Sequence, residues 1–184
     1  PQWWNNCGAA TLGTYLSFWG FELTQGDIAP VLKPDPEDRH IDVTEVVTYV
    51  RTLGMGAEAR VGGDPGLLKR LIFAGFPVMV ETWHVRSASD QLGHFRLVSG
   101  YDDGAQHFVL QDSLDGPDLP IGYQELDELW RVFNRVYIVV FPEERAGEVA
   151  GVLGPSWDEQ AAVRAALDVA RGEAEMGVPL CVAY

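Results

Sequence analysis

The succession of secondary-structure signals along the chain restricts its fold more than any other feature. Four segments of strand length are rich in β-branched and aromatic residues, and they follow a largely helical beginning; they are residues 77–83, 94–101, 108–112 and 136–141. An Asp102-Asp103-Gly104 turn between the second and third segments predicts a β-hairpin. Helices first and mostly antiparallel strands afterwards predict an α+β fold, in contrast to the alternating βαβ units of a parallel sheet.

Apolar residues at helical spacing predict the helices around these strands. The first begins at Cys7, where Asn5 and Asn6 are suitable capping residues, and ends at Gly20. Further helices are expected over residues 42–53, 65–74, 123–132 and 157–176. Residues 25–41 contain three prolines and are expected to form an irregular connection.

Composition divides the chain into three expected parts. Residues 1–142 form the main domain, and residues 143–155, which mix charged residues with three glycines, are expected to be a linker. Residues 156–184 then form a C-terminal helical segment. This segment could begin a helical repeat region or attach the domain to a larger helical scaffold, but one helix does not establish a period.

The charge balance argues against two classes of partner. The chain has 13 Lys+Arg and 27 Asp+Glu, a formal net charge of −14, and its longest basic run is Lys69-Arg70. Nucleic acids and anionic membrane surfaces are bound by clustered cations, so we expect neither as a partner. No apolar run approaches the roughly 20 residues that span a bilayer, so no membrane segment is expected in this fragment.

The first residue and the cysteines bear on processing and cofactors. Because the chain begins at Pro1 without a methionine, an N-terminal targeting region is expected to be missing. We therefore expect a soluble domain, cytoplasmic or exported, of open oligomeric state. Cys7 and Cys181 are too few for a disulfide framework, although they could pair if the termini met, and no His/Cys cluster has the spacing of a zinc site. Neither metal nor cofactor is expected.

Cys7 is the candidate nucleophile. A thiol with a pKa of ~8.5 is only a few per cent thiolate at neutral pH, and the positive end of a helix dipole favours the anion. Gly8 would leave room for a substrate to approach the sulfur. A buried hydrophobic cysteine is the commoner situation, but the polar Asn-Asn-Cys-Gly setting argues against it.

His94 and Asp112 are candidates for its base and for the acid that orients the base. His94 opens one strand and Asp112 closes the next, so the hairpin between them would bring both side chains together. Taken alone, each has an ordinary structural interpretation. Among the other histidines, His84 at a strand end is the serious alternative, whereas His40 and His107 are expected at the surface.

Residues near Cys7 in sequence could complete the site. Gln2 precedes the cysteine by five positions, and its amide could donate a hydrogen bond to an oxyanion together with the Cys7 N–H. Four tryptophans are candidates for the walls of a substrate cleft, with core packing about equally expected; they are Trp3, Trp4, Trp83 and Trp130.

Together these residues form a pattern that resembles a known family. Gln-x4-Cys-Gly, GHFRLVSGYDD and the aspartate of FVLQD resemble the bacteriocin-processing, double-glycine leader peptidases of the papain-like superfamily, over roughly residues 1–142. Relatives commonly have proline where this chain has Ala9. The best-known relatives are fused to transporters and cut leader peptides after paired glycines, whereas this fragment contains no transporter segment.

The resemblance implies a papain-like fold in which a helix carrying the cysteine packs on an antiparallel sheet. It implies Cys7 as nucleophile, His94 as general base, Asp112 as orienting acid and Gln2 as oxyanion donor. The expected activity is that of a cysteine peptidase, which hydrolyses a peptide or protein substrate through a thioester. Two alternatives stay open: a cysteine amidase or acyl transferase, and a catalytically silent module that binds peptides.

Overall fold

The computed structural model describes residues 6–35, 40–87 and 90–178. Seven α-helices occur in this part of the chain: α1 (Cys7–Phe18), α2 (Gln25–Leu32), α3 (Val43–Thr52), α4 (Pro65–Phe73), α5 (Tyr123–Trp130), α6 (Ala146–Leu153) and α7 (Glu159–Glu175). Three short 3-10 helices accompany them: η1 (Arg131–Phe133), η2 (Glu143–Arg145) and η3 (Gly154–Trp157).

Within the described ranges, six strands form one antiparallel sheet: β1 (Met55–Arg60), β2 (Val78–Ser87), β3 (Asp90–Asp102), β4 (His107–Asp112), β5 (Gly116–Gly122) and β6 (Tyr137–Pro142). Their order across the sheet is β1-β6-β2-β3-β4-β5. The predicted α+β class is confirmed. The predicted hairpin joins β3 to β4, where the Asp102 carboxylate accepts from the Gly104 and Ala105 N–H groups.

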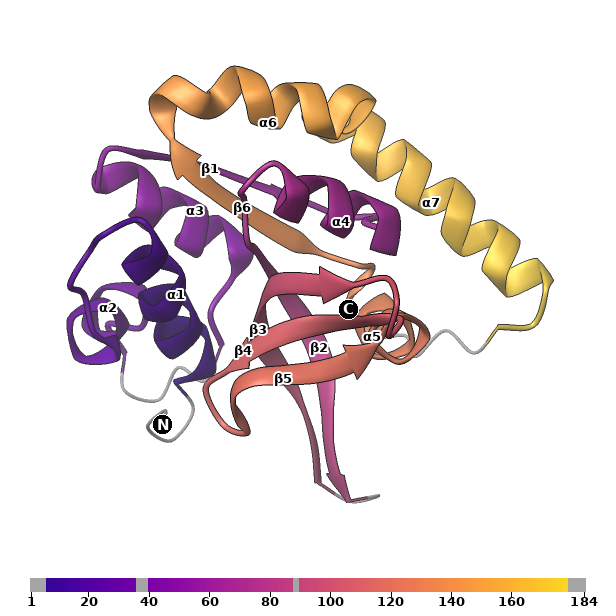
Figure 1. Ribbon diagram of the computed structural model, residues 1–184, viewed down its shortest axis with the longest axis horizontal. Helices are drawn as coiled ribbons and strands as arrows, with labels where there is room; N and C mark the ends of the chain where they lie inside the picture. Colours follow the sequence, from indigo (N-terminus) through magenta and orange to yellow (C-terminus); the bar gives the residue numbers. More distant parts are fainter. Residues whose placement is uncertain (1–5, 36–39, 88–89, 179–184) are drawn as a thin grey trace.

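One layer of helices packs on each face of the sheet, and the apolar side chains between them are buried. Helices α1, α2 and α3 pack on one face, against side chains such as Met79 and Leu97. Helices α4, α5 and α6 pack on the other, against Val80 and Val98. Met79 and Val80 are adjacent in β2, so the alternation of a strand supplies both cores. Figure 1 shows α1–α3 gathered beside the sheet, with α6 and α7 crossing one end of the molecule.

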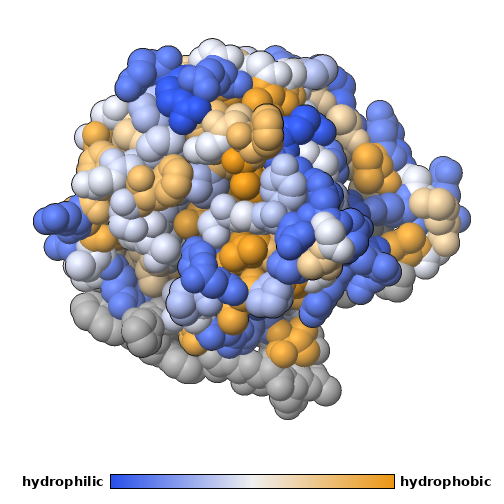
Figure 2. Space-filling model, viewed as in Figure 1, coloured by the Kyte–Doolittle hydropathy of each residue, from blue (hydrophilic) through white to orange (hydrophobic). Residues whose placement is uncertain are grey.

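The surface is mixed in character. Figure 2 shows hydrophilic side chains over most of one face, with apolar side chains exposed in small groups between them. No helix among the described residues combines the length and apolarity needed to cross a membrane.

Two expectations for irregular segments are wrong. Residues 25–41 include helix α2, because Thr24 and Asp27 form a capping box at its start and Ile28 and Leu32 bury its apolar side. These interactions hold the helix although Pro30 lies inside it and cannot donate a backbone hydrogen bond.

The expected linker, residues 143–155, contains helix α6. Val149 and Leu153 on this helix are buried in the core that α4 and α5 share with the sheet. The segment after it is also attached: the Arg60 guanidinium on β1 donates to the carbonyl oxygens of Ser156 and Trp157. The chain therefore continues from β6 into the core without a flexible break.

Candidate active site

Helix α1 places Cys7 at its first turn. Asn6 precedes the helix, but its side chain makes no capping hydrogen bond; its amide nitrogen donates to Gln25 Oε1 at 3.4 Å. The amide groups of this first turn lie beside the Cys7 sulfur, where the positive end of the helix favours an anion. The predicted position of Cys7 is confirmed, whereas the expected capping by Asn6 is wrong.

Helix α1 lies against β3 just where β4 leaves it. The last regular β3–β4 pair at this end is Leu97 with Gln111. Beyond it, the Thr11 hydroxyl on α1 donates to the Phe95 carbonyl at 3.0 Å, and the Phe95 backbone also hydrogen-bonds the Cys7 sulfur. A helix thus takes the place of a strand along this edge and brings Cys7 next to His94.

Gly8 makes this approach possible. It is buried, and a Cβ at this position would lie 2.9 Å from Ile41 Cδ1 and 3.3 Å from the Phe95 ring. The space left by the missing side chain is therefore occupied by Ile41 and Phe95. The sequence had suggested that this space would be open to a substrate. Its backbone N–H hydrogen-bonds the Cys7 sulfur. A contact between Gly8 and a substrate stays a prediction.

The hairpin brings His94 and Asp112 together in the interior. His94 Nε2 lies 2.9 Å from Asp112 Oδ1, and the side chains are 0% and 1% exposed. Asp112 Oδ1 also accepts from the backbone N–H groups of Leu114 and Asp115. An ionised carboxylate only accepts, so the proton of this bond belongs to His94 Nε2.

The other ring nitrogen of His94 is the one available to Cys7. Among the described residues, Nδ1 has no regular hydrogen-bond partner, although it is buried. In the neutral tautomer set by Asp112, this nitrogen carries a lone pair and can take a proton from the thiol.

Interactions between Cys7, His94 and Asp112 shift the pKa values of these groups. Burial alone would raise the pKa of Cys7, but His94 and the backbone of Phe95 and Gly8 outweigh it, and the pKa lies below its ordinary value. Burial would lower the pKa of His94, but Asp112 and Cys7 raise it above its ordinary value. Opposite shifts of this kind favour a thiolate–imidazolium pair.

Asp112 stays ionised beside this pair. Burial opposes its charge, yet hydrogen bonds and charge from His94 and Arg96, with the Leu114 N–H, hold the pKa of its carboxyl well below the usual range. Arg96 Nε donates to Asp112 Oδ2 at 2.7 Å. The carboxylate is therefore shared between an imidazole and a guanidinium.

Arg96, Thr82 and His84 surround the pair; of these, only His84 had a candidate role from sequence, as the alternative to His94. Arg96 donates to the Thr82 hydroxyl at 3.2 Å and lies 3.0 Å from His84 Nδ1, and the His84 and His94 rings are 5.2 Å apart. His84 thus contacts Arg96 instead of replacing His94. Alternation along β3 places Arg96 on the same face as His94, where a buried guanidinium requires an anion.

Three of the remaining predicted site residues, Gln2, Trp3 and Trp4, lie outside the described residues. Trp83 is described and lies away from the imidazole. Trp83 pairs with Gly93, whereas its neighbour Thr82 pairs with His94, so Trp83 lies on the opposite face of the sheet from the imidazole. Its ring packs 5.6 Å from that of Phe133.

Trp130 belongs to the core. It is fully buried, and its indole N–H donates to the Val136 carbonyl at 2.6 Å. Its expected place in a cleft wall is therefore wrong.

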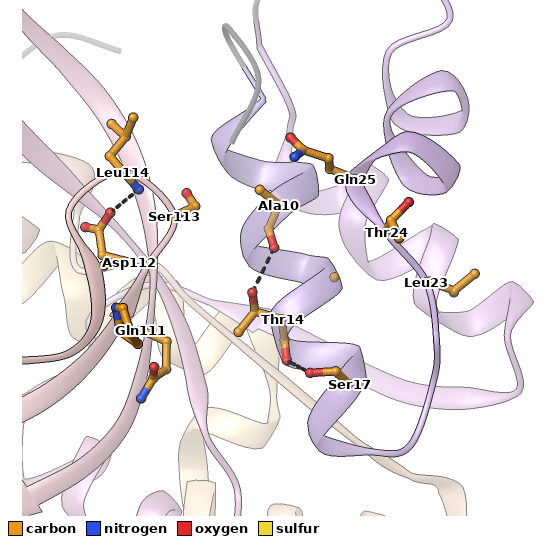
Figure 3. A pocket seen from close by; sticks show the side chains of 13 residues that line it. Ala10, Thr14, Ser17, Leu23, Thr24, Gln25, Gln111, Asp112, Ser113 and Leu114 are labelled. Carbon is orange, nitrogen blue, oxygen red and sulfur yellow. Dashed lines mark hydrogen bonds between the residues drawn. The ribbon is translucent and has the colours of Figure 1, made fainter. Parts of the chain in front are cut away.

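A groove of about 550 Å³ opens next to Asp112, between α1 and the turn that joins β4 to β5. Figure 3 shows Gln111, Asp112, Ser113 and Leu114 on one side and Ala10, Thr14 and Ser17 of α1 on the other. Hydroxyl and amide side chains share this lining with apolar ones, and among the described residues Asp112 is the charged side chain that lines it.

Comparison with protein families identifies the family of the chain. The model of the Peptidase_C39 like family matches residues 1–138, which include Cys7, His94 and Asp112. The chain belongs to the Peptidase_C39 like family. No curated protein matches the sequence.

Solved structures share the C39 fold at low sequence identity. The peptidase domain of Streptococcus ComA, a bifunctional ABC transporter involved in quorum sensing, has a TM-score of 0.61 and 16% identity, over 78% of this chain and 96% of that one. A C39-like peptidase from Bacillus anthracis has a TM-score of 0.57 and 14% identity, over 76% and 90%. A double glycine motif protease of an AMS/PCAT transporter, in complex with its leader peptide, has a TM-score of 0.58 and 18% identity, over 77% and 88%.

Proposed function

We propose that this C39-like domain is a cysteine peptidase that hydrolyses a peptide bond through Cys7, His94 and Asp112. The observation that carries the proposal is the buried 2.9 Å bond between His94 and Asp112, which leaves Nδ1 of the imidazole for the thiol. Family membership supports peptide-bond chemistry, and the leader peptide bound to one solved relative supports a peptide as substrate.

The first half of the reaction forms a thioester. The Cys7 thiolate attacks the carbonyl carbon, and the negative charge moves to the carbonyl oxygen, beside the N–H groups at the start of α1. Gln2 is proposed to donate to the same oxygen. The C–N bond then breaks as the His94 imidazolium gives its proton to the leaving amine.

The second half regenerates the enzyme. Neutral His94 takes a proton from water as the water oxygen attacks the thioester, and the C–S bond breaks to release a carboxylic acid and the Cys7 thiolate. Asp112 remains ionised throughout and stabilises the imidazolium, both in the initial ion pair and when it forms again during hydrolysis.

Peptide cleavage with a mass readout tests this function. The protein is incubated with a mixed peptide library, and new termini are identified by mass spectrometry; Cys7→Ala is the matched control. We expect internal cleavage that Cys7→Ala abolishes, together with an acyl adduct on Cys7 under rapid acid quench. Transfer to added amines without hydrolysis, or no turnover with Cys7 intact, would contradict the proposal.

A further inference from the structure

Arg96 is buried and makes more contacts than a single ion pair with Asp112. It is 7% exposed, and all three of its nitrogens meet partners. Nε donates to Asp112 Oδ2 at 2.7 Å, Nη1 donates to the Thr82 hydroxyl at 3.2 Å, and Nη2 lies 3.0 Å from His84 Nδ1. A planar guanidinium with three fixed bonds has little freedom to move.

This arrangement fixes the plane of the Asp112 carboxylate. Oδ1 accepts from His94 and from two backbone N–H groups, while Oδ2 accepts from Arg96 on β3. The two oxygens are thus held from different sides, and the carboxylate cannot rotate without breaking a charged hydrogen bond. The orientation of His94 depends on that plane.

The charge of Arg96 also acts on the ion pair. Within the described parts of the chain, the titratable and charged groups around His94 are Cys7 on α1, Asp112 on β4, Arg96 on β3, His84 on β2 and Asp115 in the following turn. Asp115 Oδ2 is 3.9 Å from Arg96 and 3.8 Å from His84, and its side chain is half exposed. The buried Asp112 therefore has a buried cation beside it as well as the imidazole.

His84 supports the same assignment of charges. Burial, and then the neighbouring His94, lower its pKa. Neutral His84 can accept from Arg96 through Nδ1, as the 3.0 Å contact requires. Arg96 is consequently the permanent positive charge of the cluster.

We propose that Arg96 is a positioning residue that fixes Asp112 against His94 and, through its positive charge, sets the pH at which the Cys7–His94 ion pair is lost. This inference rests on the proposed function. Because Arg96 shares the charge of Asp112, the imidazolium gives up its proton at a lower pH than it would beside an unshared carboxylate.

Two substitutions separate charge from geometry. Arg96→Met removes the cation at similar length, and Arg96→Lys keeps the cation but loses the three-way fork. Arg171→Met, at an exposed position on α7, is the matched control. The titration midpoint of the His94 imidazole is measured by nitrogen-15 NMR in each folded variant, and kcat and KM are measured on a cleaved peptide.

We expect Arg96→Met to raise the His94 midpoint by about one pH unit, because a nearby like charge has been removed. Arg96→Lys should keep the midpoint within a few tenths of a unit while kcat falls about tenfold or more and KM changes little. Arg171→Met should change neither. An unchanged or lowered midpoint in Arg96→Met would overturn the charge assignment, and full kcat in Arg96→Lys would overturn the positioning role.

The NMR titration needs no substrate. If the wild-type protein cleaves no peptide, the proposed function fails while the midpoints still decide the role of Arg96's charge. If Arg96→Met does not fold, Arg96→Lys is compared with Arg96→Gln, which keeps hydrogen-bonding capacity without charge; equal midpoints in that pair would overturn the proposal.

Discussion

His94 Nε2 lies 2.9 Å from Asp112 Oδ1, and neither side chain is exposed beyond 1%. The two residues come from neighbouring strands, β3 and β4, of one hairpin. Their bond leaves the second imidazole nitrogen for Cys7 on a helix that replaces β4 along the end of β3.

Asp112 is expected to stabilise the fold mainly through Arg96. In Asp112→Asn, the amide can still accept from His94 but presents a donor or a neutral oxygen to a buried guanidinium. Breaking a buried ion pair costs about 3–5 kcal/mol, so we expect a loss of that order in urea unfolding. Arg96→Met should recover part of it in the double variant, and equal or greater instability there would contradict the account.

Thr11 is expected to hold α1 against β3. Thr11→Val keeps the shape but leaves the buried Phe95 carbonyl without its 3.0 Å bond, and this should cost about 1–3 kcal/mol in urea unfolding. Thr14→Val removes an exposed hydroxyl that bonds within the helix and should stay within about 0.5 kcal/mol. Similar losses for both variants would show that the bond between α1 and β3 is unimportant.

Glu81 is expected to make the protein less stable above neutral pH. Burial, with a smaller effect of Asp42, raises the pKa of Glu81 to about 7 from an ordinary 4.5. The unfolded chain releases this proton at lower pH than the folded chain, so stability falls as pH rises from about 4.5 to 7.

Glu81→Gln should remove that loss. We expect it to increase the free energy of unfolding at pH 8 by roughly 1–3 kcal/mol relative to wild type, with little change at pH 4.5. Glu128→Gln, at an exposed position on α5, serves as the control. A Glu81→Gln effect that is the same at both pH values would refute the burial of an ionisable carboxyl.

Helix α6 is expected to be part of the main core. Leu153 is 4% exposed, so Leu153→Ala should lower stability by about 2–5 kcal/mol. Leu167→Ala, at a 47% exposed position on α7, should cost less than about 0.5 kcal/mol. If thermal unfolding distinguishes neither variant from wild type, residues 143–155 behave as the linker that composition suggested.

The sequence predicted the parts of the fold whose signals are local. Strands with many β-branched residues, such as β6, and the capped helix α3 carry their own patterns. Strand β1, with sequence MGAEAR, and strand β5, with two prolines, have weak strand propensity and form because neighbouring strands pair with them. Helix α6 was not predicted because its glycines are typical of a linker, although Val149 and Leu153 form an apolar side that the core buries.

For the site, the hairpin was enough to predict that His94 and Asp112 meet, because register follows from a short turn. The contact of α1 with the edge of β3 is a tertiary arrangement that no local pattern encodes. The contacts of Arg96 also depend on that arrangement, since the same alternation would suit an arginine at a solvent-facing position. The candidate catalytic residues could therefore be predicted from the sequence, whereas the residues that surround them in the fold could not.

The pH dependence of Cys7 alkylation tests the central claim most directly. Iodoacetamide labelling is followed by mass spectrometry in wild type and His94→Ala, with the urea-unfolded chain as reference for an ordinary thiol. We expect a wild-type midpoint clearly below ~8.5 and a distinctly higher midpoint in His94→Ala, where only the backbone hydrogen bonds of Phe95 and Gly8 oppose burial. Equal, ordinary midpoints in both proteins would contradict the Cys7–His94 ion pair and with it the proposed peptidase mechanism.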